Sequence, residues 1–173
     1  MKLMLHICCG PCSLYVIDNL KSRGIDDITG FFFNPNIHPY DELIRRWKSA
    51  QIAANVKEIP LISFFNYDLA KWKSFDGISA DRCRMCYRTR FEATAKYASE
   101  NGFTHFSSTL FVSPYQNHEV MTEEALRAAK IYGIEFLENS DYREGFYDGQ
   151  KQARDLGLYR QKYCGCIKSL LGN

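Results

Sequence analysis

The chain has 173 residues, of which 46% are hydrophobic and 24% are charged, and this composition excludes disordered and fibrous proteins. Lys and Arg outnumber Asp and Glu by only 22 to 20, so a polyanionic partner must bind a local basic patch. No apolar run approaches the ~20 residues that span a bilayer, and the N-terminal apolar run lacks the cleavage site of a signal peptide. We therefore expect a cytoplasmic protein with no membrane partner.

Apolar runs and helical periodicity predict strands and helices that alternate along the chain. The predicted strands are residues 2–7, 28–33, 58–62, 103–110 and 134–137. The predicted helices are residues 13–23, 41–55, 82–101, 119–132, 142–156 and 167–171, with a helical turn within 66–75. This order predicts one α/β domain over residues 1–173, in which a mostly parallel five-stranded sheet has helices on both faces.

Ligands of such folds bind beyond the carboxyl ends of the parallel strands. The loops after the first four predicted strands are therefore expected to converge on one edge of the sheet, which is the predicted active site. The C-terminal tail, about residues 157–173, is expected to close over that edge.

Two further predictions concern polar side chains. His6 lies on a central strand and is predicted to be a core histidine that hydrogen-bonds to the backbone. Helix 41–55 is amphipathic, so its charged residues Arg45, Arg46 and Lys48 are expected to face outward.

The chain contains seven cysteines, which fall into three tight groups. The groups are Cys8, Cys9 and Cys12; Cys83 and Cys86; and Cys164 and Cys166. An odd number of cysteines, with two of them adjacent and no export signal, argues against a disulfide framework. The first and second groups follow the first and third predicted strands, so their loops are expected to meet. The clusters therefore indicate metal or redox chemistry.

Three kinds of chemistry suit these cysteines. Cys9-Gly10-Pro11-Cys12 is the active-site tetrapeptide of thioredoxin, and its place at a helix N-terminus favours a reactive thiolate, as in a dithiol oxidoreductase. Two C-x-x-C pairs also suit a tetrahedral zinc site, which would make the chain a zinc-stabilised RNA-binding domain. A 4Fe–4S cluster likewise takes four thiolates and leaves spare cysteines for a second metal or for redox work. The spacing alone leaves these alternatives open.

Five motifs, in order over residues 3–169, resemble one family. They are Leu5–Ser13, Phe33–Tyr40, Arg82–Tyr87, Ser108–Leu110 with Ser113–Gln116, and Tyr159–Cys166. The sequence is similar to the cobalamin-independent epoxyqueuosine reductases (QueH), which complete queuosine at the wobble position of tRNA. This resemblance implies an iron–sulfur reductase whose sheet is related to the adenine-nucleotide hydrolase-like (PP-loop) group. It also implies two partners: a tRNA that carries epoxyqueuosine in its anticodon loop, and an electron donor that the sequence does not name.

Turning an epoxide into an alkene removes one oxygen as water and consumes two electrons and two protons. We expect Cys8, Cys9, Cys83 and Cys86 to hold a 4Fe–4S cluster, because their two loops leave parallel strands at the same edge. A second iron beside the cluster would act as a Lewis acid on the epoxide oxygen. The further candidates are Asp68 as carboxylate ligand of that iron, Cys12 as reactive thiol, Cys164 and Cys166 as redox dithiol or iron ligands, and Tyr163 as proton donor.

Basic residues predict where tRNA binds. Residues 82–90 contain four arginines and no acid, and a second basic stretch lies in the tail. Because phosphate contacts dominate affinity for nucleic acids, we expect the tRNA backbone to contact Arg84, Arg88, Arg160 and Lys162. An extruded anticodon base also needs an aromatic stacking partner, such as Tyr87 or Tyr115.

Overall fold

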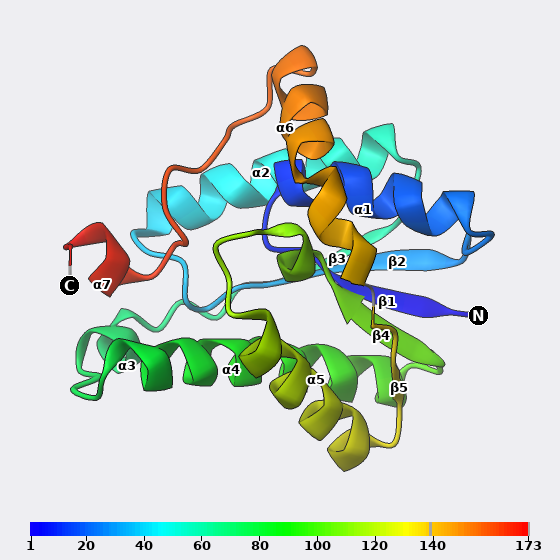
Figure 1. Ribbon diagram of the computed structural model, residues 1–173. Helices are drawn as coiled ribbons and strands as arrows, with labels where there is room; N and C mark the ends of the chain where they lie inside the picture. Colours follow the sequence, from blue (N-terminus) through cyan, green and yellow to red (C-terminus); the bar gives the residue numbers. More distant parts are fainter. Residues whose placement is uncertain (139, 173) are drawn as a thin grey trace.

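A five-stranded parallel sheet forms the centre of the molecule (Figure 1). The computed structural model describes residues 1–138 and 140–172; residues 139 and 173, which the predicted domain and tail include, lie outside the described residues. The strands are β1 (Leu3–His6), β2 (Ile28–Phe33), β3 (Leu61–Phe64), β4 (His105–Ser108) and β5 (Glu135–Phe136). Their order is β3-β2-β1-β4-β5, and every neighbouring pair is parallel. The predicted α/β class and parallel sheet are confirmed.

Helices cover both faces of the sheet. They are α1 (Gly10–Ser22), α2 (Tyr40–Val56), α3 (Leu69–Lys73), α4 (Ser79–Glu100), α5 (His118–Tyr132), α6 (Phe146–Asp155) and α7 (Ile167–Leu170), with the 3₁₀ segments η1 (Thr109–Val112) and η2 (Ser140–Gly145). Figure 1 shows α1, α2 and α6 on one face and α4 and α5 on the other. Within the described residues, no helix is both long enough and apolar enough to cross a membrane.

The central strand β1 is buried along its whole length. Leu3, Met4 and Leu5 are inaccessible to solvent, as expected for a strand between two covered faces. His6 is the polar exception. Its Nε2 lies 3.1 Å from the carbonyl oxygen of Phe33, and its Nδ1 lies 2.9 Å from the hydroxyl oxygen of Ser108. The prediction of a core histidine bonded to the backbone is confirmed.

A glycine allows α1 to begin directly against α2. A Cβ atom on Gly10 would lie 2.3 Å from Ser49 Oγ and 2.5 Å from the Ser49 carbonyl oxygen, far inside van der Waals contact. The residue therefore has to be glycine for the first turn of α1 to sit where it does. That turn carries Cys12 and follows Cys9, so this packing positions both thiols.

Two strands, β3 and β4, differ from their predicted bounds by two residues or more, for local reasons. The third strand was expected from residue 58, but α2 continues to Val56 and Glu58 adopts a left-handed conformation with φ of 53°. The strand begins only at Leu61. The fourth strand ends at Ser108, because its hydroxyl accepts a hydrogen bond from the backbone N–H of Leu110 and starts the 3₁₀ turn η1.

His6 makes folding stability depend on pH. Burial, with a smaller contribution from the charge of Arg90, lowers the pKa of His6 from 6.5 to about 4. Between these pH values the unfolded chain binds a proton that the folded chain rejects, so the free energy of unfolding should fall as pH falls from 6.5 towards 4. The loss should be on the order of 3 kcal/mol. In a His6→Gln variant, denaturant titrations should show a smaller dependence on pH over this window; an equal dependence would contradict the assignment.

Candidate active site

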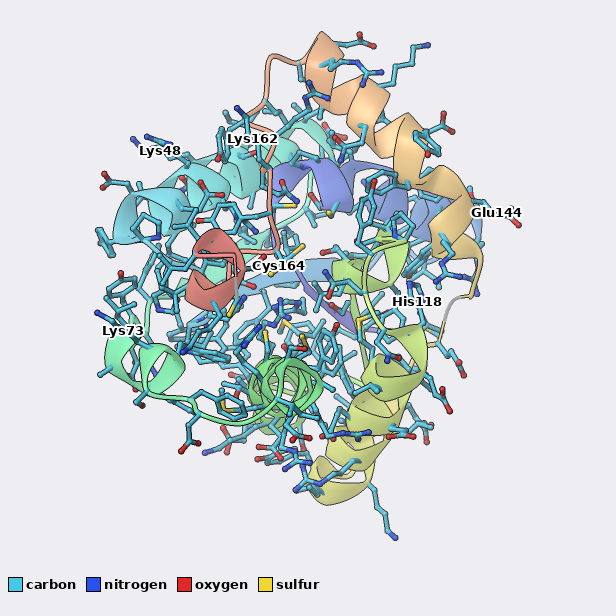
Figure 2. The ribbon with its side chains drawn as sticks, turned by 60° about the vertical axis from the view of Figure 1, so that its left-hand side comes forward. Lys48, Lys73, His118, Glu144, Lys162 and Cys164 are labelled. Atoms are coloured by element: carbon cyan, nitrogen blue, oxygen red, sulfur yellow. The ribbon has the colours of Figure 1, made fainter. Side chains whose placement is uncertain are left out.

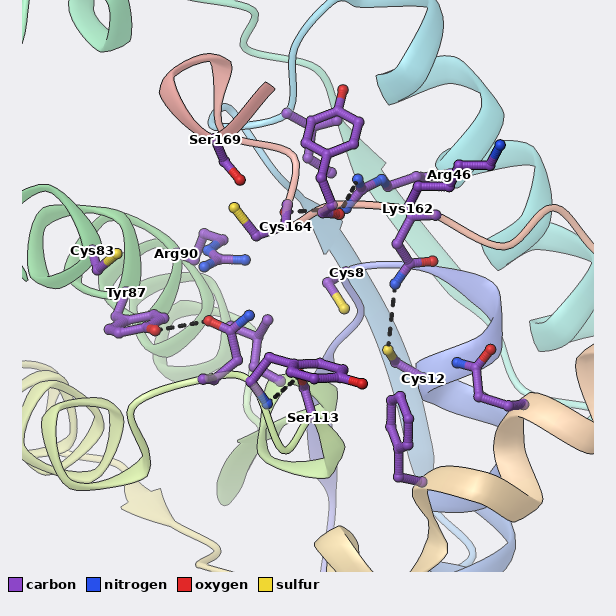
Figure 3. A pocket seen from close by; sticks show the side chains of 18 residues that line it. Cys8, Cys12, Arg46, Cys83, Tyr87, Arg90, Ser113, Lys162, Cys164 and Ser169 are labelled. Carbon is purple, nitrogen blue, oxygen red and sulfur yellow. Dashed lines mark hydrogen bonds between the residues drawn. The ribbon is translucent and has the colours of Figure 1, made fainter. Parts of the chain in front are cut away.

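A cavity of about 640 Å³ lies at the carboxyl edge of the sheet, a volume within the range of small-ligand sites. Its wall comes from the turn after β1, the start of α4, the segment after β4, α6 and the tail (Figure 3). It combines thiols, aromatic rings, amides and cations. The lining residues used below are Cys8, Cys12, Arg46, Cys83, Tyr87, Arg90, Ser113, Tyr115, Gln116, Phe146, Gln161, Lys162, Tyr163 and Cys164.

Cys8, Cys9 and Cys12 form a buried three-thiol group. Their sulfur atoms all lie within 4.8 Å of one another, and those of Cys8 and Cys9 are 3.7 Å apart. The group forms because β1 runs straight into α1: Cys9 is the extended N-cap residue, with Pro11 in the first turn. Thr109 on η1 closes the group, since its hydroxyl lies 3.5 Å from the sulfur of Cys8.

The three-thiol group has the donor set of a metal site. Hydrogen bonds from the thiols of Cys12 and Cys9 hold the pKa of Cys8 well below its usual range. Burial raises the pKa of Cys9, and the hydrogen bond to Cys8 raises that of Cys12. Within the group, negative charge is therefore favoured on the sulfur of Cys8 and disfavoured on those of Cys9 and Cys12. A bound cation would allow the other two thiols to ionise, as thiolate ligands must.

The other four cysteines lie across the cavity. Cys83, Cys86, Cys164 and Cys166 all line a smaller adjoining space of about 50 Å³. Figure 3 shows Cys83 and Cys164 facing the same cavity as Cys8 and Cys12. All three sequence groups therefore meet at one edge of the sheet, from segments more than seventy residues apart.

Arg90 is a buried cation beside these thiols. It is 4% exposed, and its Nη2 lies 3.0 Å from the sulfur of Cys86. Burial raises the pKa of Cys86 to about 12, and the charge of Arg90 acts in the opposite direction. Among the described residues no carboxylate forms an ion pair with Arg90, so thiolates are its natural counter-charges.

A buried ion pair on α2 holds the tail. Arg46 donates from Nε to Glu42 at 2.8 Å, and both side chains are at most 5% exposed. The other two guanidinium nitrogens of Arg46 donate to the carbonyl oxygens of Cys164 and Tyr163, at 3.1 and 2.9 Å. The hydroxyl of Tyr159 donates to the second oxygen of Glu42 at 2.5 Å. The expectation that Arg46 faces outward was wrong, because the tail supplies buried acceptors for it.

The turn between the tail cysteines also requires glycine. Gly165 has φ of +106°, and a Cβ atom there would lie 2.9 Å from Ile37 and 3.2 Å from Nη1 of Arg46. Its carbonyl oxygen accepts from the backbone N–H of His38 at 2.8 Å. The hydroxyl of Tyr163 donates to the His38 carbonyl oxygen, and burial raises the pKa of Tyr163 to about 12.

Gln161 is a tail residue in direct contact with the three-thiol group, and sequence reasoning missed it. Its Nε2 lies 3.0 Å from the sulfur of Cys9 and 3.8 Å from that of Cys12. Its Oε1 is buried and has no hydrogen-bond partner among the described residues. The sequence signal that could have found it is its place within the motif Tyr159–Cys166, three residues before Cys164.

Asp68 is the N-cap residue of α3. Its Oδ1 accepts from the backbone N–H of Lys71 at 3.1 Å, so the carboxylate caps α3, and it lines neither of the two cavities. The cap uses one of the two carboxylate oxygens.

The four predicted tRNA contacts differ in their surroundings. Arg84 pairs with Glu123 and Glu124, and Arg88 pairs with Glu124, whose side chain is 2% exposed. These bonds join α4 to α5. Arg160 and Lys162 are exposed, and neither forms an ion pair within the part of the chain that the structure describes. Figure 2 shows Lys162 on the same side of the molecule as Lys48.

The chain is similar to known proteins over almost its whole length. Residues 3–171 match the sequence model of the family described as Epoxyqueuosine reductase QueH. This chain belongs to the QueH family. A QueH protein from Acinetobacter baylyi is 39% identical over 180 residues, which cover 98% of this chain and 80% of the relative. One from Dehalococcoides mccartyi is 36% identical over 171 residues, covering 97% and 92%. The family is named for a reductase activity, which belongs to the oxidoreductase class of enzymes.

Solved structures share only the fold with this QueH chain. A deacetylase of the teicoplanin biosynthesis pathway, in complex with teicoplanin, has a TM-score of 0.56 at 9% identity and covers 91% of this chain and 88% of its own. The same kind of deacetylase in complex with bog has a TM-score of 0.54. These likenesses agree with the α/β class.

Replacing Arg46 should release the tail. An Arg46→Gln variant leaves Glu42 buried without its charge partner, and breaking such a pair is strongly destabilising. In the metal-free protein we expect alkylation of Cys166, which is 7% exposed, to quicken by at least about tenfold while far-ultraviolet circular dichroism stays native. A Lys48→Gln variant, on the exposed side of the same helix, is the matched control. Equal alkylation rates in both variants would contradict the anchoring role.

Proposed function

We propose that this chain reduces epoxyqueuosine to queuosine in tRNA, with electrons delivered through an iron–sulfur centre. The observation that carries this proposal is the meeting of all three cysteine groups around one cavity. Membership of the QueH family supplies the substrate. A dithiol oxidoreductase is less well supported, because Cys9 of the thioredoxin-like tetrapeptide is only 1% exposed and a reactive thiol needs access.

We propose that Cys8, Cys9, Cys83 and Cys86 hold a 4Fe–4S cluster. Cys8 and Cys83 line the same cavity, with Cys9 and Cys86 buried beside them. Arg90 supplies a positive charge next to the sulfur of Cys86, which offsets the negative charge of thiolate ligands. When bound, the cluster supplies single electrons, and a second iron with an open position would polarise the epoxide oxygen.

Cys12 and the tail residues are the proposed catalytic groups. Cys12 belongs to the three-thiol group and lines the cavity, so it is available as a reactive thiol or as a ligand of the second iron. Cys164 and Cys166 act either as a redox dithiol or as further iron ligands. Tyr163 keeps its proton at neutral pH, as a proton donor must, and would have to release the carbonyl oxygen of His38 to transfer it.

The tail, about residues 157–173, is proposed to close over the substrate. The buried pair of Glu42 and Arg46 fixes its backbone at Tyr163 and Cys164, and Gln161 reaches from it to the three-thiol group. A closed tail would exclude water and hold the reacting ring against the thiols.

Anaerobic reconstitution tests the proposed function. The wild-type protein should turn brown, contain iron and sulfide, and convert an epoxyqueuosine-containing anticodon stem-loop when dithionite supplies electrons. A Cys83→Ser variant should fold without assembling the cluster. A variant with both Cys164 and Cys166 replaced by Ser should keep the cluster spectrum and lose conversion.

Each result bears on a separate part of the proposal. A colourless wild-type protein that retains zinc, or a loaded enzyme that leaves the epoxide intact, would contradict the reductase function. Full iron content in the Cys83→Ser variant would overturn the ligand assignment. Retained conversion by the double tail variant would remove the catalytic role of Cys164 and Cys166.

Salt dependence tests the proposed tRNA contacts. Replacing both Arg160 and Lys162 by Gln should lower the slope of log affinity against log salt by about one unit per lost phosphate contact. The paired Arg84→Gln and Arg88→Gln changes should have a smaller effect, because Glu123 and Glu124 already neutralise these charges. A Lys130→Gln variant is the control. If only the α4 variant changes the slope, the tRNA lies over α4 and not over the tail.

A further inference from the structure

An exposed aromatic pair stands at the wall of the cavity. Tyr115 is 82% exposed, although it lines the cavity. Its ring meets that of Phe146, at the start of α6, edge to face, with centroids 5.9 Å apart and planes at 84°. The backbone N–H of Tyr115 donates to Ser113 Oγ at 3.3 Å, which fixes the turn that carries the ring (Figure 3). The face of the Tyr115 ring is thus held at the cavity while it remains open to solvent.

Two amides with fixed orientations line the same cavity. The hydroxyl of Tyr87 accepts from the backbone N–H of Asn117 and donates to Oε1 of Gln116 at 2.7 Å, so the NH₂ group of Gln116 is left to donate elsewhere. The Gln161 amide is held through its NH₂ group instead of its oxygen. Its NH₂ group faces the sulfur of Cys9, and its buried Oε1 has no partner among the described residues. The cavity therefore offers a donor from Gln116, whereas Oε1 of Gln161 is closed to solvent in this conformation.

These features together fit one nucleobase. Bases stack on aromatic side chains when they leave a nucleic acid loop, and their edges carry both donors and acceptors. The cavity of about 640 Å³ has room for a nucleoside, and the exposed cation of Lys162 lies at its wall, where a phosphate would follow. A substrate without a ring system would leave the face of Tyr115 uncovered.

We propose that the cavity receives a single extruded base of the tRNA, which stacks on Tyr115 and hydrogen-bonds through its edge to the amide of Gln116. This inference rests on the proposed function and adds a recognition site to it. Stacking holds the base plane, and the amide of Gln116 sets its rotation within that plane. The group attached to the base is thereby directed towards the thiols of Cys8 and Cys12.

Binding of stem-loops by the metal-loaded protein, without reductant, tests this site. The two RNAs are an epoxyqueuosine-containing anticodon stem-loop and the same stem-loop with an abasic wobble position. Tyr115→Ala should weaken binding of the first RNA by about tenfold or more, as expected for one lost base stack. Tyr115→Phe, which keeps the ring, should stay within about twofold of wild type. Tyr147→Ala is the matched control, because Tyr147 is 78% exposed and neighbours Phe146 without lining the cavity.

The decisive result is whether the loss of binding caused by removing the Tyr115 ring depends on the presence of the wobble base. Removing the wobble base should weaken binding to wild type much more than binding to Tyr115→Ala, since the variant has already lost the stack. Equal losses in both proteins, or a Tyr147→Ala effect as large as that of Tyr115→Ala, would overturn the inference. Conversion of epoxyqueuosine by the wild-type enzyme is measured separately. If the enzyme converts its substrate but the losses from the Tyr115 change and from the missing base are independent, only the base site is overturned. If the two losses are coupled but no conversion occurs, only the proposed function is overturned.

Discussion

The candidate site depends on the buried ion pair between Glu42 and Arg46. A buried pair is stable only when hydrogen bonds satisfy its remaining donors and acceptors. Here the tail provides them: the carbonyl oxygens of Tyr163 and Cys164 accept from Arg46, and Tyr159 donates to Glu42. These partners lie more than one hundred residues from α2 in the sequence. The tail is therefore required to complete α2, and α2 is required to position the tail cysteines.

The parallel sheet supplies the other half of the arrangement. Because β1 is the central strand and all strands are parallel, the segments that follow β1 and β4 emerge side by side at one edge. Thr109, just after β4, then contacts Cys8, just after β1. The glycine at position 10 permits α1 to begin against α2, which brings the three-thiol group close to the helix that holds the tail. Fold, tail and thiols thus form one connected unit.

Much of this arrangement could be predicted from local sequence signals. The apolar run 28–33 ends before Asn-Pro-Asn, and β2 has those bounds; the grouping of the cysteines followed from their places after predicted strands. What local patterns could not reveal is the partner of a charged side chain. Arg46 has the helical spacing of a surface residue and yet is buried, because its acceptors come from the tail. Arg84 and Arg88 belong to a stretch free of acids in sequence, but α5 brings Glu124 to both in space. Gln161 lies within the motif Tyr159–Cys166, but only the fold places its amide on the sulfur of Cys9.

The location of the metal tests the central claim most directly. Crystals of the anaerobically reconstituted protein, measured at the iron absorption edge, would give an anomalous map that does not depend on assumed ligands. The account predicts iron in the cavity between the group of Cys8 and Cys9 and the α4 thiols of Cys83 and Cys86. Anomalous density confined to another part of the molecule, with none beside these four thiols, would contradict it.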